Sequence, residues 1–242
     1  RQVLSWGNGL FYAPMDLVNP FDPAAVDTEY KVGDDMLYLQ YLRGNGHDVQ
    51  AAAVFRRDAL TGERRSDEGT VAVKYHGFAG EHEYDILVGE NLGNPVLGLG
   101  AVGSFGGAVW RGDLVVTDTD DETRVEFVTN VSYSWTWNEK NVSGAAEYYN
   151  DDGDNQYLAG SLMIEMSPLW TVTPTLLFNI EDPSALVQLI TSYSLGDNMT
   201  FLASLNLPVG PNGSEFGGID AGLPGRYLSR GVGVFAQLAW YF

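Results

Sequence analysis

The chain has 242 residues and a formal net charge of -19, with 32 acidic side chains against 13 lysines and arginines. This excess of carboxylates argues against nucleic acid as a partner, because phosphate binding depends on Lys and Arg. The absence of cysteine excludes a disulfide framework and a thiolate metal site. No apolar stretch approaches the ~18 residues of a membrane-spanning helix, but a transmembrane barrel strand needs only about 10 alternating residues.

Large apolar residues alternate with smaller or polar ones along most of the chain, which predicts strands rather than helices. In the segment TRVEFVTNVSYSWTW, Val125, Phe127 and Val131 share one face, and Arg124 and Glu126 share the other. The predicted strands, in chain order, are 1–7, 35–43, 49–56, 71–76, 82–91, 95–103, 107–117, 124–137, 142–149, 158–166, 172–180, 187–194, 199–207 and 232–242. We therefore predict a single all-β domain over residues 1–242, with about fourteen strands and no linker.

The connections between these strands alternate between two classes. The first class is short throughout, at 44–46, 79–81, 104–106, 138–141, 168–170 and 196–198. The interleaved class is longer at 8–34, 58–69, 117–122, 150–156 and 208–228, with short members at 91–94 and 181–183. Short turns at one end and longer loops at the other are typical of outer-membrane barrels. The predicted fold class is an antiparallel up-and-down transmembrane β-barrel, and the alternative is a soluble β-sandwich.

Large aromatic residues concentrate at the ends of the predicted strands. Buried Trp and Tyr in a sandwich need hydrogen-bond partners, whereas aromatic residues at a membrane interface form girdles. The distribution therefore favours the barrel. The predicted membrane-interface aromatics are Trp135, Trp137, Trp170, Trp240, Tyr241 and Phe242.

The last strand, GVFAQLAWYF, is an alternating apolar segment that ends in phenylalanine. It resembles the terminal strand that Gram-negative outer-membrane proteins present to the barrel assembly machinery. The resemblance implies a location in the bacterial outer membrane, with the lipid bilayer, lipopolysaccharide and the assembly machinery as partners. It implies nothing about a substrate.

The segment RQVLSWGNGLFYAPMDLVNPFDP is similar to a second motif, which occurs in porin-like proteins. The matching residues are Arg1, Gln2, Trp6, Gly7, Gly9, Pro14, Asp16, Asn19, Pro20, Phe21, Asp22 and Pro23. The motif covers about a tenth of the chain and implies a barrel family rather than an activity. Several strands usually precede it in such proteins, so this chain is expected to be either a whole barrel or the C-terminal part of a larger one.

Residues 8–34 form a long predicted loop, in which three prolines fix the backbone and remove hydrogen-bond donors. A stiff loop of this kind can fold into a wide barrel and narrow it, and its carboxylates then favour cations. The predicted constriction residues are Asp16, Asn19, Asp22, Asp27 and Glu29. The alternative is a loop that lies over the barrel mouth with its carboxylates in water.

Charged residues of both signs share the predicted lumen face. They are Arg56, Lys74, His76, Asp85, Arg111, Asp113, Arg124, Glu126, Glu147 and Glu165. Four of them, Arg111, Asp113, Arg124 and Glu126, fall on strands predicted to be adjacent, so ion pairs between strands are expected there. One interpretation is a transverse field that orients polar solutes in a pore. The other is a set of pairs that neutralises a plugged or narrow interior.

Metal binding and catalysis find little support. The acidic segments 118–122 and 150–155 lack the full spacing of a calcium loop, so we expect solvated loops, no metal and no cofactor. His76 faces Asp85 across a predicted hairpin, but no serine is obviously placed to complete a catalytic set. We therefore do not expect an enzyme.

The expected function is an outer-membrane channel for passive diffusion of small hydrophilic solutes, with a preference for cations. About fourteen strands leave more room than the eight whose interior side chains alone can fill. The first alternative is a plugged, non-conducting barrel that serves as a scaffold or as a sleeve for a partner protein. The second is a soluble all-β binding or hydrolytic module.

Overall fold

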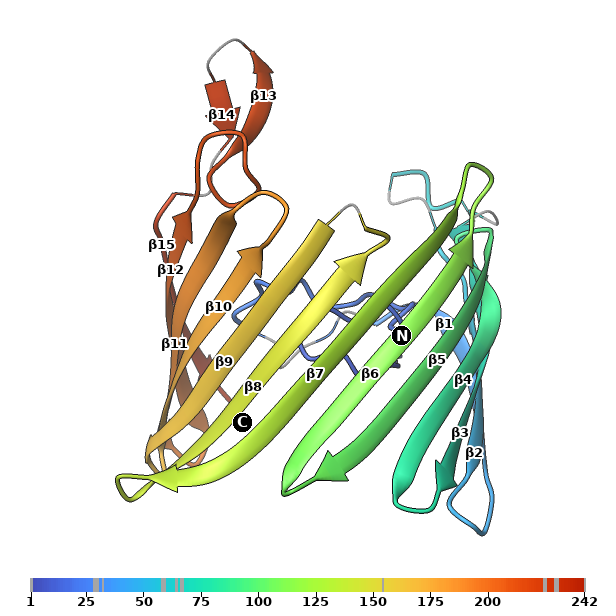
Figure 1. Ribbon diagram of the computed structural model, residues 1–242, viewed down its shortest axis with the longest axis horizontal. Coiled ribbons are helices and arrows are strands. Elements are labelled where there is room, and N and C mark those ends of the chain that lie inside the picture. The colour runs from blue at the N-terminus through green and yellow to red at the C-terminus, as the bar shows by residue number, and fades with distance from the viewer. Residues whose placement is uncertain are drawn as a thin grey trace. The chain divides into compact units, whose positions relative to one another are not determined.

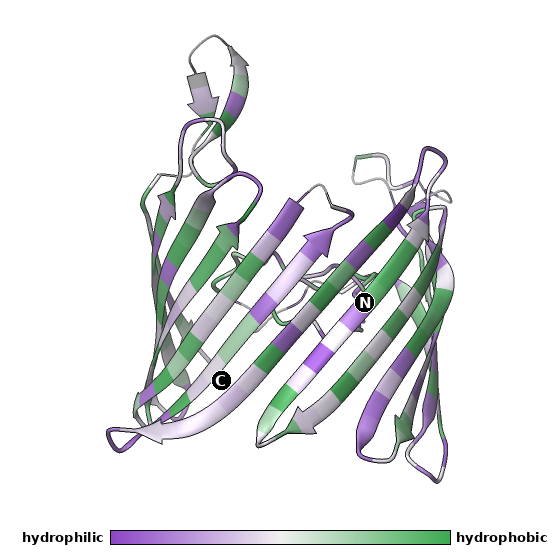
Figure 2. Ribbon diagram, in the orientation of Figure 1, coloured by the Kyte–Doolittle hydropathy of each residue, from purple (hydrophilic) through white to green (hydrophobic). Residues whose placement is uncertain are grey.

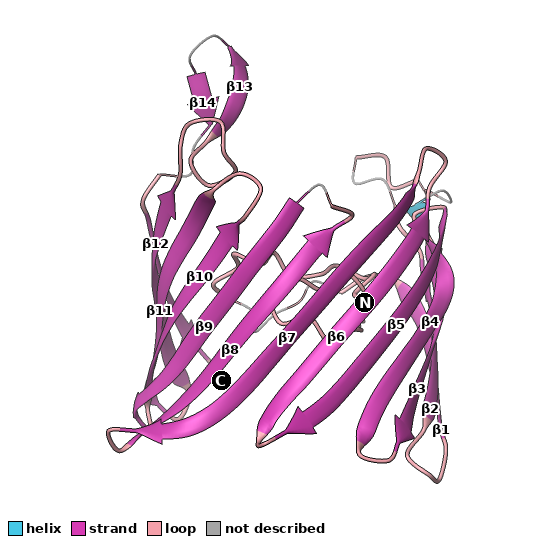
Figure 3. Ribbon diagram, viewed as in Figure 1, coloured by secondary structure: helices cyan, strands magenta, loops and turns pink. Residues whose placement is uncertain are grey.

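A computed structural model describes residues 2–27, 31, 33–57, 60–63, 65, 68–153, 155–223, 226–228 and 231–241. This part of the chain contains no α-helix and is built almost entirely of strands and turns (Figure 3). Among the same residues, none belongs to a helix that is both long and apolar enough to cross a membrane. The predicted all-β class is confirmed.

Fifteen strands occur in the described residues. They are β1 (Met36–Leu42), β2 (Asp48–Val54), β3 (Thr70–Ala79), β4 (His82–Asn91), β5 (Asn94–Phe105), β6 (Ala108–Asp118), β7 (Thr123–Trp137), β8 (Lys140–Asp151), β9 (Asn155–Ser167), β10 (Trp170–Asn179), β11 (Ser184–Gly196), β12 (Met199–Val209), β13 (Ile219–Leu223), β14 (Arg226–Leu228) and β15 (Gly233–Trp240). Thirteen form one sheet in the order β1 to β12 and then β15, and β13 pairs with β14 alone (Figure 1). This is an up-and-down antiparallel sheet, the arrangement that a barrel requires.

The described chain divides into two compact units, which are treated separately below. Unit 1 comprises Arg1–Asp22, Thr28–Asn130 and Tyr149–Asp152, and so holds β1 to β6 with the start of β7 and the end of β8. Unit 2 comprises Pro23–Asp27, Val131–Tyr148 and Gly153–Phe242, and so holds the rest of β7 and β8 with all later strands.

Two-residue turns connect several of the long strands. Gly106 and Gly107 join β5 to β6 with φ values of 56° and 85°, and Asn138 and Glu139 join β7 to β8 with φ values of 49° and 62°. Positive φ at both central residues matches the twist of a two-residue antiparallel hairpin. Such turns fix the register of the strands that they connect.

The strands of both units carry a continuous row of exposed apolar side chains on one face, which we call the apolar face. In unit 1 it includes Val71, Val73, Ile86, Val88, Leu97, Leu99 and Leu114, and in unit 2 Leu158, Leu162, Leu176, Val187, Leu189, Leu205, Val234 and Leu238. Registers such as Val88 opposite Leu97 and Leu205 opposite Val234 align these residues across neighbouring strands. Green bands recur along successive strands in Figure 2. The alternation predicted from sequence is confirmed.

One strand prediction and one loop prediction are wrong. Residues 2–7 do not form a strand: only Gln2 makes a bridge, to Asp34, and Trp6 instead turns its side chain onto the sheet. Gly7 has a φ of 90°, a conformation that ends an extended segment. The predicted loop 208–228 also contains the hairpin β13–β14, whose short strands give too few alternating positions to be detected.

Candidate functional site

The N-terminal segment of unit 1, residues 2–22, packs against the face of the sheet opposite the apolar face. We call this the loop-bearing face. Trp6, Met15, Leu17 and Val18 from the segment join strand residues in one apolar cluster, with Trp6 only 3% exposed and Met15 fully buried. The strand members of the cluster are Ala52, Val54, Ala72, Leu87, Val96 and Val115. Within unit 1 the segment is therefore part of the core rather than a flap over the sheet.

Two glycines of β5 make room for the segment. A Cβ built on Gly98 would lie 3.0 Å from Cε of Met15 and 3.2 Å from Cβ of Leu87. One built on Gly100 would lie 2.8 Å from both Nδ2 of Asn8 and Oδ1 of Asp113. Glycine inside a strand often marks the close approach of another backbone. The alternate glycines in GLG at 98–100 are a sequence signal for this packing that the predictions above do not use.

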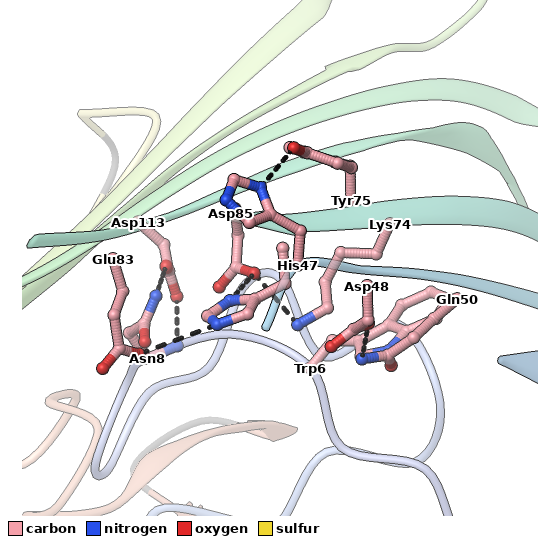
Figure 4. A network of polar contacts seen from close by, with 11 residues as sticks. Trp6, Asn8, His47, Asp48, Gln50, Lys74, Tyr75, Glu83, Asp85 and Asp113 are labelled. Carbon is pink, nitrogen blue, oxygen red and sulfur yellow. Dashed lines mark hydrogen bonds and ion pairs between the residues drawn. The ribbon is translucent and has the colours of Figure 1, made fainter. Parts of the chain in front are cut away.

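Asp113 on β6 fixes the start of the segment (Figure 4). Its carboxylate accepts hydrogen bonds from the backbone N–H of Asn8 at 2.6 Å and from Nδ2 of Asn8 at 2.7 Å. Asn130 on β7 donates from Nδ2 to the carbonyl oxygen of Asn8 at 2.9 Å. Asp113 is almost fully buried, so these bonds replace water that the carboxylate would otherwise bind.

Two aromatic residues of the segment have polar partners on the strands. The Trp6 indole N–H donates to Oε1 of Gln50 at 2.7 Å, and Nε2 of Gln50 donates to Asp48 at 2.8 Å. The ring of Tyr12 stacks on that of Tyr149 on β8 at a centroid distance of 4.8 Å. The segment is thus held by directional contacts on β2, β6, β7 and β8 of unit 1.

A charged cluster on β3 and β4 joins three of the predicted lumen residues (Figure 4). Oδ1 of Asp85 lies 3.1 Å from Nζ of Lys74 and 3.0 Å from Nδ1 of His76, and Glu83 lies 3.9 Å from Nε2 of His76. The predicted contact between His76 and Asp85 is confirmed by their direct opposition in the sheet. Lys74 and Asp85 are both buried, so each needs the other to offset its lost hydration.

Asp16 forms a buried ion pair with Lys31, a residue that the sequence reading did not single out. Nζ of Lys31 also donates to the carbonyl oxygen of Leu4 and to Oγ of Ser5. Burial raises the pKa of Asp16 above its ordinary value, and the nearby Lys31 lowers it only in part. Because Lys31 offsets its charge, Asp16 contributes less to a negative field than was predicted.

Arg56 is also tied to the segment. Its Nη1 donates to the Glu68 carbonyl at 2.6 Å and to Oγ1 of Thr70 at 2.8 Å, and its Nη2 donates to the Leu17 carbonyl at 3.3 Å. It lines a cavity of about 290 Å³ together with Asn19, Gly33, Asp34, Asp35, Phe55, Arg57 and Glu68. Asn19 therefore lines the same cavity as Arg56.

Ion pairs between strands were predicted among Arg111, Asp113, Arg124 and Glu126, and the structure gives three of these residues other hydrogen-bond partners. Nη2 of Arg124 lies 2.8 Å from Oδ1 of Asp151, and Glu126 accepts a hydrogen bond from the Tyr149 hydroxyl at 2.6 Å. Asp113 bonds Asn8, as described above, and Arg111 is half-buried on the same face. The segment supplied the partner of Asp113, which strand pairing alone could not predict.

Residues 23–27 of the N-terminal loop belong to unit 2 and contact β11 there. Nε2 of the buried Gln188 on β11 donates to the Ala24 carbonyl and to Oδ1 of Asn206, each at 2.9 Å. Glu165 accepts a hydrogen bond from Nδ2 of Asn141 at 2.7 Å, and Glu147 is buried. Among the remaining predicted constriction residues, Asp22 in unit 1 is exposed and Asp27 in unit 2 is half-buried, and Glu29 lies outside the described residues.

The predicted interface aromatics of unit 2 are exposed beside its short turns. Trp137 ends β7, Trp170 starts β10, and Trp240 ends β15 and pairs with Met199 just after the turn at 197–198. Trp135 and Tyr241 are exposed as well. Phe242 lies outside the described residues.

Comparisons with protein-family models, curated proteins and solved structures give no match to this chain. The described residues hold no cluster of three or more His, Cys, Asp or Glu side chains arranged to bind a metal ion. In chemical terms, the arrangement is a sheet with one apolar face and one face of buried, mutually bonded charges that a folded segment covers. Such a face can bind, orient or exclude a polar solute through fixed charges.

Proposed function

We propose that this chain forms a channel in the bacterial outer membrane for passive diffusion of small hydrophilic solutes. The proposed partners are the lipid bilayer, lipopolysaccharide, the barrel assembly machinery and the solutes themselves. The proposed role is not catalytic. The resemblances of the C-terminal strand and of the N-terminal motif to outer-membrane and porin-like proteins favour this function.

The observation that carries the proposal is the opposite character of the two faces of the same strands. On β3 and β4, Val73 and Val88 are exposed on the apolar face, whereas Lys74 and Asp85 form a buried pair on the loop-bearing face. A soluble monomer rarely exposes a contiguous apolar patch larger than a few hundred Å². Apolar residues outside and polar residues inside are the pattern of a transmembrane barrel.

The N-terminal segment is the proposed filter of the channel. It lies on the loop-bearing face of unit 1, where Asp113 and Lys74–Asp85 fix charges beside it, and residues 23–27 reach the same face of unit 2 at Gln188. The face also carries Asp48, Glu126, Glu147 and Glu165. We propose a preference for cations, because carboxylates predominate among these charges.

Planar-bilayer recording tests this function. Purified protein, first shown to be folded by its heat-modifiable migration in detergent, should give discrete conductance steps. In a salt gradient the reversal potential should have the sign of a cation-selective pore. Well-folded protein that inserts and passes no current would overturn the channel proposal, and an anion-selective pore would overturn the selectivity alone.

A plugged barrel that serves as a scaffold or a sleeve is the second candidate. The burial of Trp6, Met15, Leu17 and Val18 favours it, because a segment that belongs to the core blocks part of the lumen in its resting state. The same recording separates the two candidates. A silent wild type that conducts once the segment is released, for example in a Lys31→Met variant, supports the plug.

A further inference from the structure

Two tryptophans on the apolar face share a hydrogen-bonded arrangement with a threonine of the neighbouring strand. In unit 1, the Trp110 indole N–H donates to Oγ1 of Thr129 at 2.8 Å, and this hydroxyl donates to the Arg111 carbonyl at 3.2 Å. In unit 2, the Trp170 indole N–H donates to Oγ1 of Thr191 at 2.8 Å, and that hydroxyl donates to the Thr171 carbonyl at 3.1 Å. In both cases the carbonyl belongs to the residue after the tryptophan.

Both indole N–H groups are directed away from the nearest turn. Trp170 is the first residue of β10, and its acceptor Thr191 lies opposite Val172, two residues further into the strand. Trp110 follows the turn at 106–107, and a Cβ built on Gly112 would lie 3.4 Å from Cζ2 of Trp110 and 3.7 Å from Oγ1 of Thr129. The polar edge of each ring therefore points toward the middle of its strand.

The other tryptophans of the apolar face differ. Within the described residues, the indole N–H groups of Trp135, Trp137 and Trp240 have no hydrogen-bond acceptor in the protein. For Trp135 the edge that reaches over the strands is the carbon edge, since Cη2 and Cζ3 lie 3.0 Å from a Cβ built on Gly144. These rings keep their N–H groups free for water or lipid headgroups.

The hydrocarbon layer offers no acceptor for an indole N–H, so an N–H that enters it must be satisfied within the protein. At a membrane interface, a tryptophan instead places its apolar body toward the acyl chains and its N–H toward the headgroups. Trp110 and Trp170 have the opposite orientation along the strand, and each has a threonine acceptor. Both are 39% or more exposed, so lipid can contact their rings directly.

We propose that Trp110 and Trp170 contact acyl chains inside the hydrocarbon layer, and that Thr129 and Thr191 are the positioning residues that allow this. Trp135, Trp137 and Trp240 lie at the headgroup level. The apolar face thus has two classes of tryptophan, which bind two chemically distinct zones of one lipid leaflet. This inference rests on the proposed membrane location but not on conduction.

Depth-dependent fluorescence quenching tests the assignment. Variants are made that keep only one tryptophan of the apolar face, at 110, 170 or 240, with phenylalanine at the other four positions; Trp6 is kept in all. A variant without any of the five gives the contribution of Trp6. Each is reconstituted in phosphatidylcholine vesicles brominated either near the headgroup end or near the methyl end of the acyl chain. Deep bromines should quench Trp110 and Trp170 more strongly than shallow ones, and Trp240 should show the reverse order.

The threonines are tested in the same backgrounds. Thr129→Val in the Trp110 variant should shift quenching toward the shallow bromines, and Thr129→Ser, which keeps the hydroxyl, should restore the deep profile. Equal depth profiles for Trp110 and Trp240, or no change on Thr129→Val, would overturn the inference. Quenching of none of the three by any brominated lipid would instead overturn the membrane location itself.

Discussion

The loop-bearing faces of the two units are built in different ways. In unit 1 the face carries a buried apolar cluster and several hydrogen bonds shared with residues 2–22, and the ion pair between Asp16 and Lys31 holds the segment itself in shape. In unit 2, Gln188 on β11 bonds the Ala24 carbonyl of the N-terminal loop. Polar side chains such as Glu165 bond their neighbours within the strands instead.

The strands of the two units therefore differ in how they contact the N-terminal loop. The strands of unit 1 form the seat of the segment: Asp113 and Arg56 bond it directly, whereas Lys74, His76 and Asp85 pair with one another beside it. On the strands of unit 2, Gln188 bonds the loop at Ala24 and Glu165 bonds Asn141 of a neighbouring strand. Changes at the seat should therefore alter the folding of the segment and the conductance together, whereas equivalent changes in unit 2 should not.

The largest effect is expected from Lys31→Met. The change leaves Asp16 buried without its cation and removes the bonds to Leu4 and Ser5. Loss of one partner from a buried pair costs about 3–5 kcal/mol. Denaturant titration in detergent should show this loss for the free energy of unfolding. Lys140→Met in unit 2 removes a single bond to the Met166 carbonyl and is the control, with an expected loss of less than about 1 kcal/mol. Equal losses would contradict the comparison.

A smaller effect is expected from Asp113→Ala. This change leaves two donors of Asn8 without their acceptor at a buried position, which should cost about 2 kcal/mol. Glu165→Ala in unit 2 removes one bond, to an exposed Asn141, and should cost less than about 1 kcal/mol. Both changes remove one carboxylate, so the two variants lose the same charge. Comparing their reversal potentials therefore separates the effect of the lost charge from the effect of the lost hydrogen bonds. A larger loss of stability for Glu165→Ala than for Asp113→Ala would contradict the claim that the strands of unit 1 hold the segment.

Glycine-to-alanine substitutions should change the free energy of unfolding in opposite directions in the two units. Gly100→Ala forces a methyl group against Asn8 and Asp113 and should destabilise the protein by about 1–3 kcal/mol while conductance increases. In unit 2, a Cβ on Gly233 of β15 would meet nothing closer than 3.9 Å. Gly233→Ala should therefore be neutral or stabilise by up to about 1 kcal/mol, because glycine weakens a strand. Unchanged conductance in Gly100→Ala would show that the segment does not limit the current.

The smallest effect concerns pH. Because burial raises the pKa of Asp16 in the folded state, the folded protein binds this proton more tightly than the unfolded chain does. The contribution of Asp16 to stability is therefore greatest in acid and falls as pH rises through its raised pKa. Unfolding titrations across this range should show that Asp16→Asn lacks the decline. If the stability of Asp16→Asn falls by the same amount with rising pH, the decline belongs to another titratable group.

Much of the fold was predictable because a half-exposed strand records its faces directly in its sequence. A strand and its two faces can be defined from an alternation such as Val125 and Phe127 on one face with Arg124 and Glu126 on the other. Thirteen of the fourteen predicted strands occur in the main sheet. The exception, residues 1–7, has alternation too, but Trp6 is drawn out of line by Gln50 and the apolar cluster. Tertiary contacts outweighed the local pattern there.

The site was less predictable, because its contacts join residues distant in sequence. His76 and Asp85 were paired correctly since a short hairpin connects them. Asp113 and Asn8 are separated by 105 positions, and no local pattern links them. Lys31 could not be singled out from the sequence, because nothing local pairs it with Asp16, fifteen positions away. Alternate glycines at 98 and 100 were the signal that, with hindsight, indicates where the segment lies.

The bridge between Gln2 and Asp34 closes the chain between them into a loop. Two backbone hydrogen bonds of 3.0 Å hold these residues together, so the intervening chain leaves and returns at almost the same point. A change of length or sequence within this closed loop would alter the residues that lie on the sheet, while the bridge keeps the start of β1 in place. In the proposed channel, the bridge would let the contacts of the enclosed loop change while its two ends stay fixed beside β1.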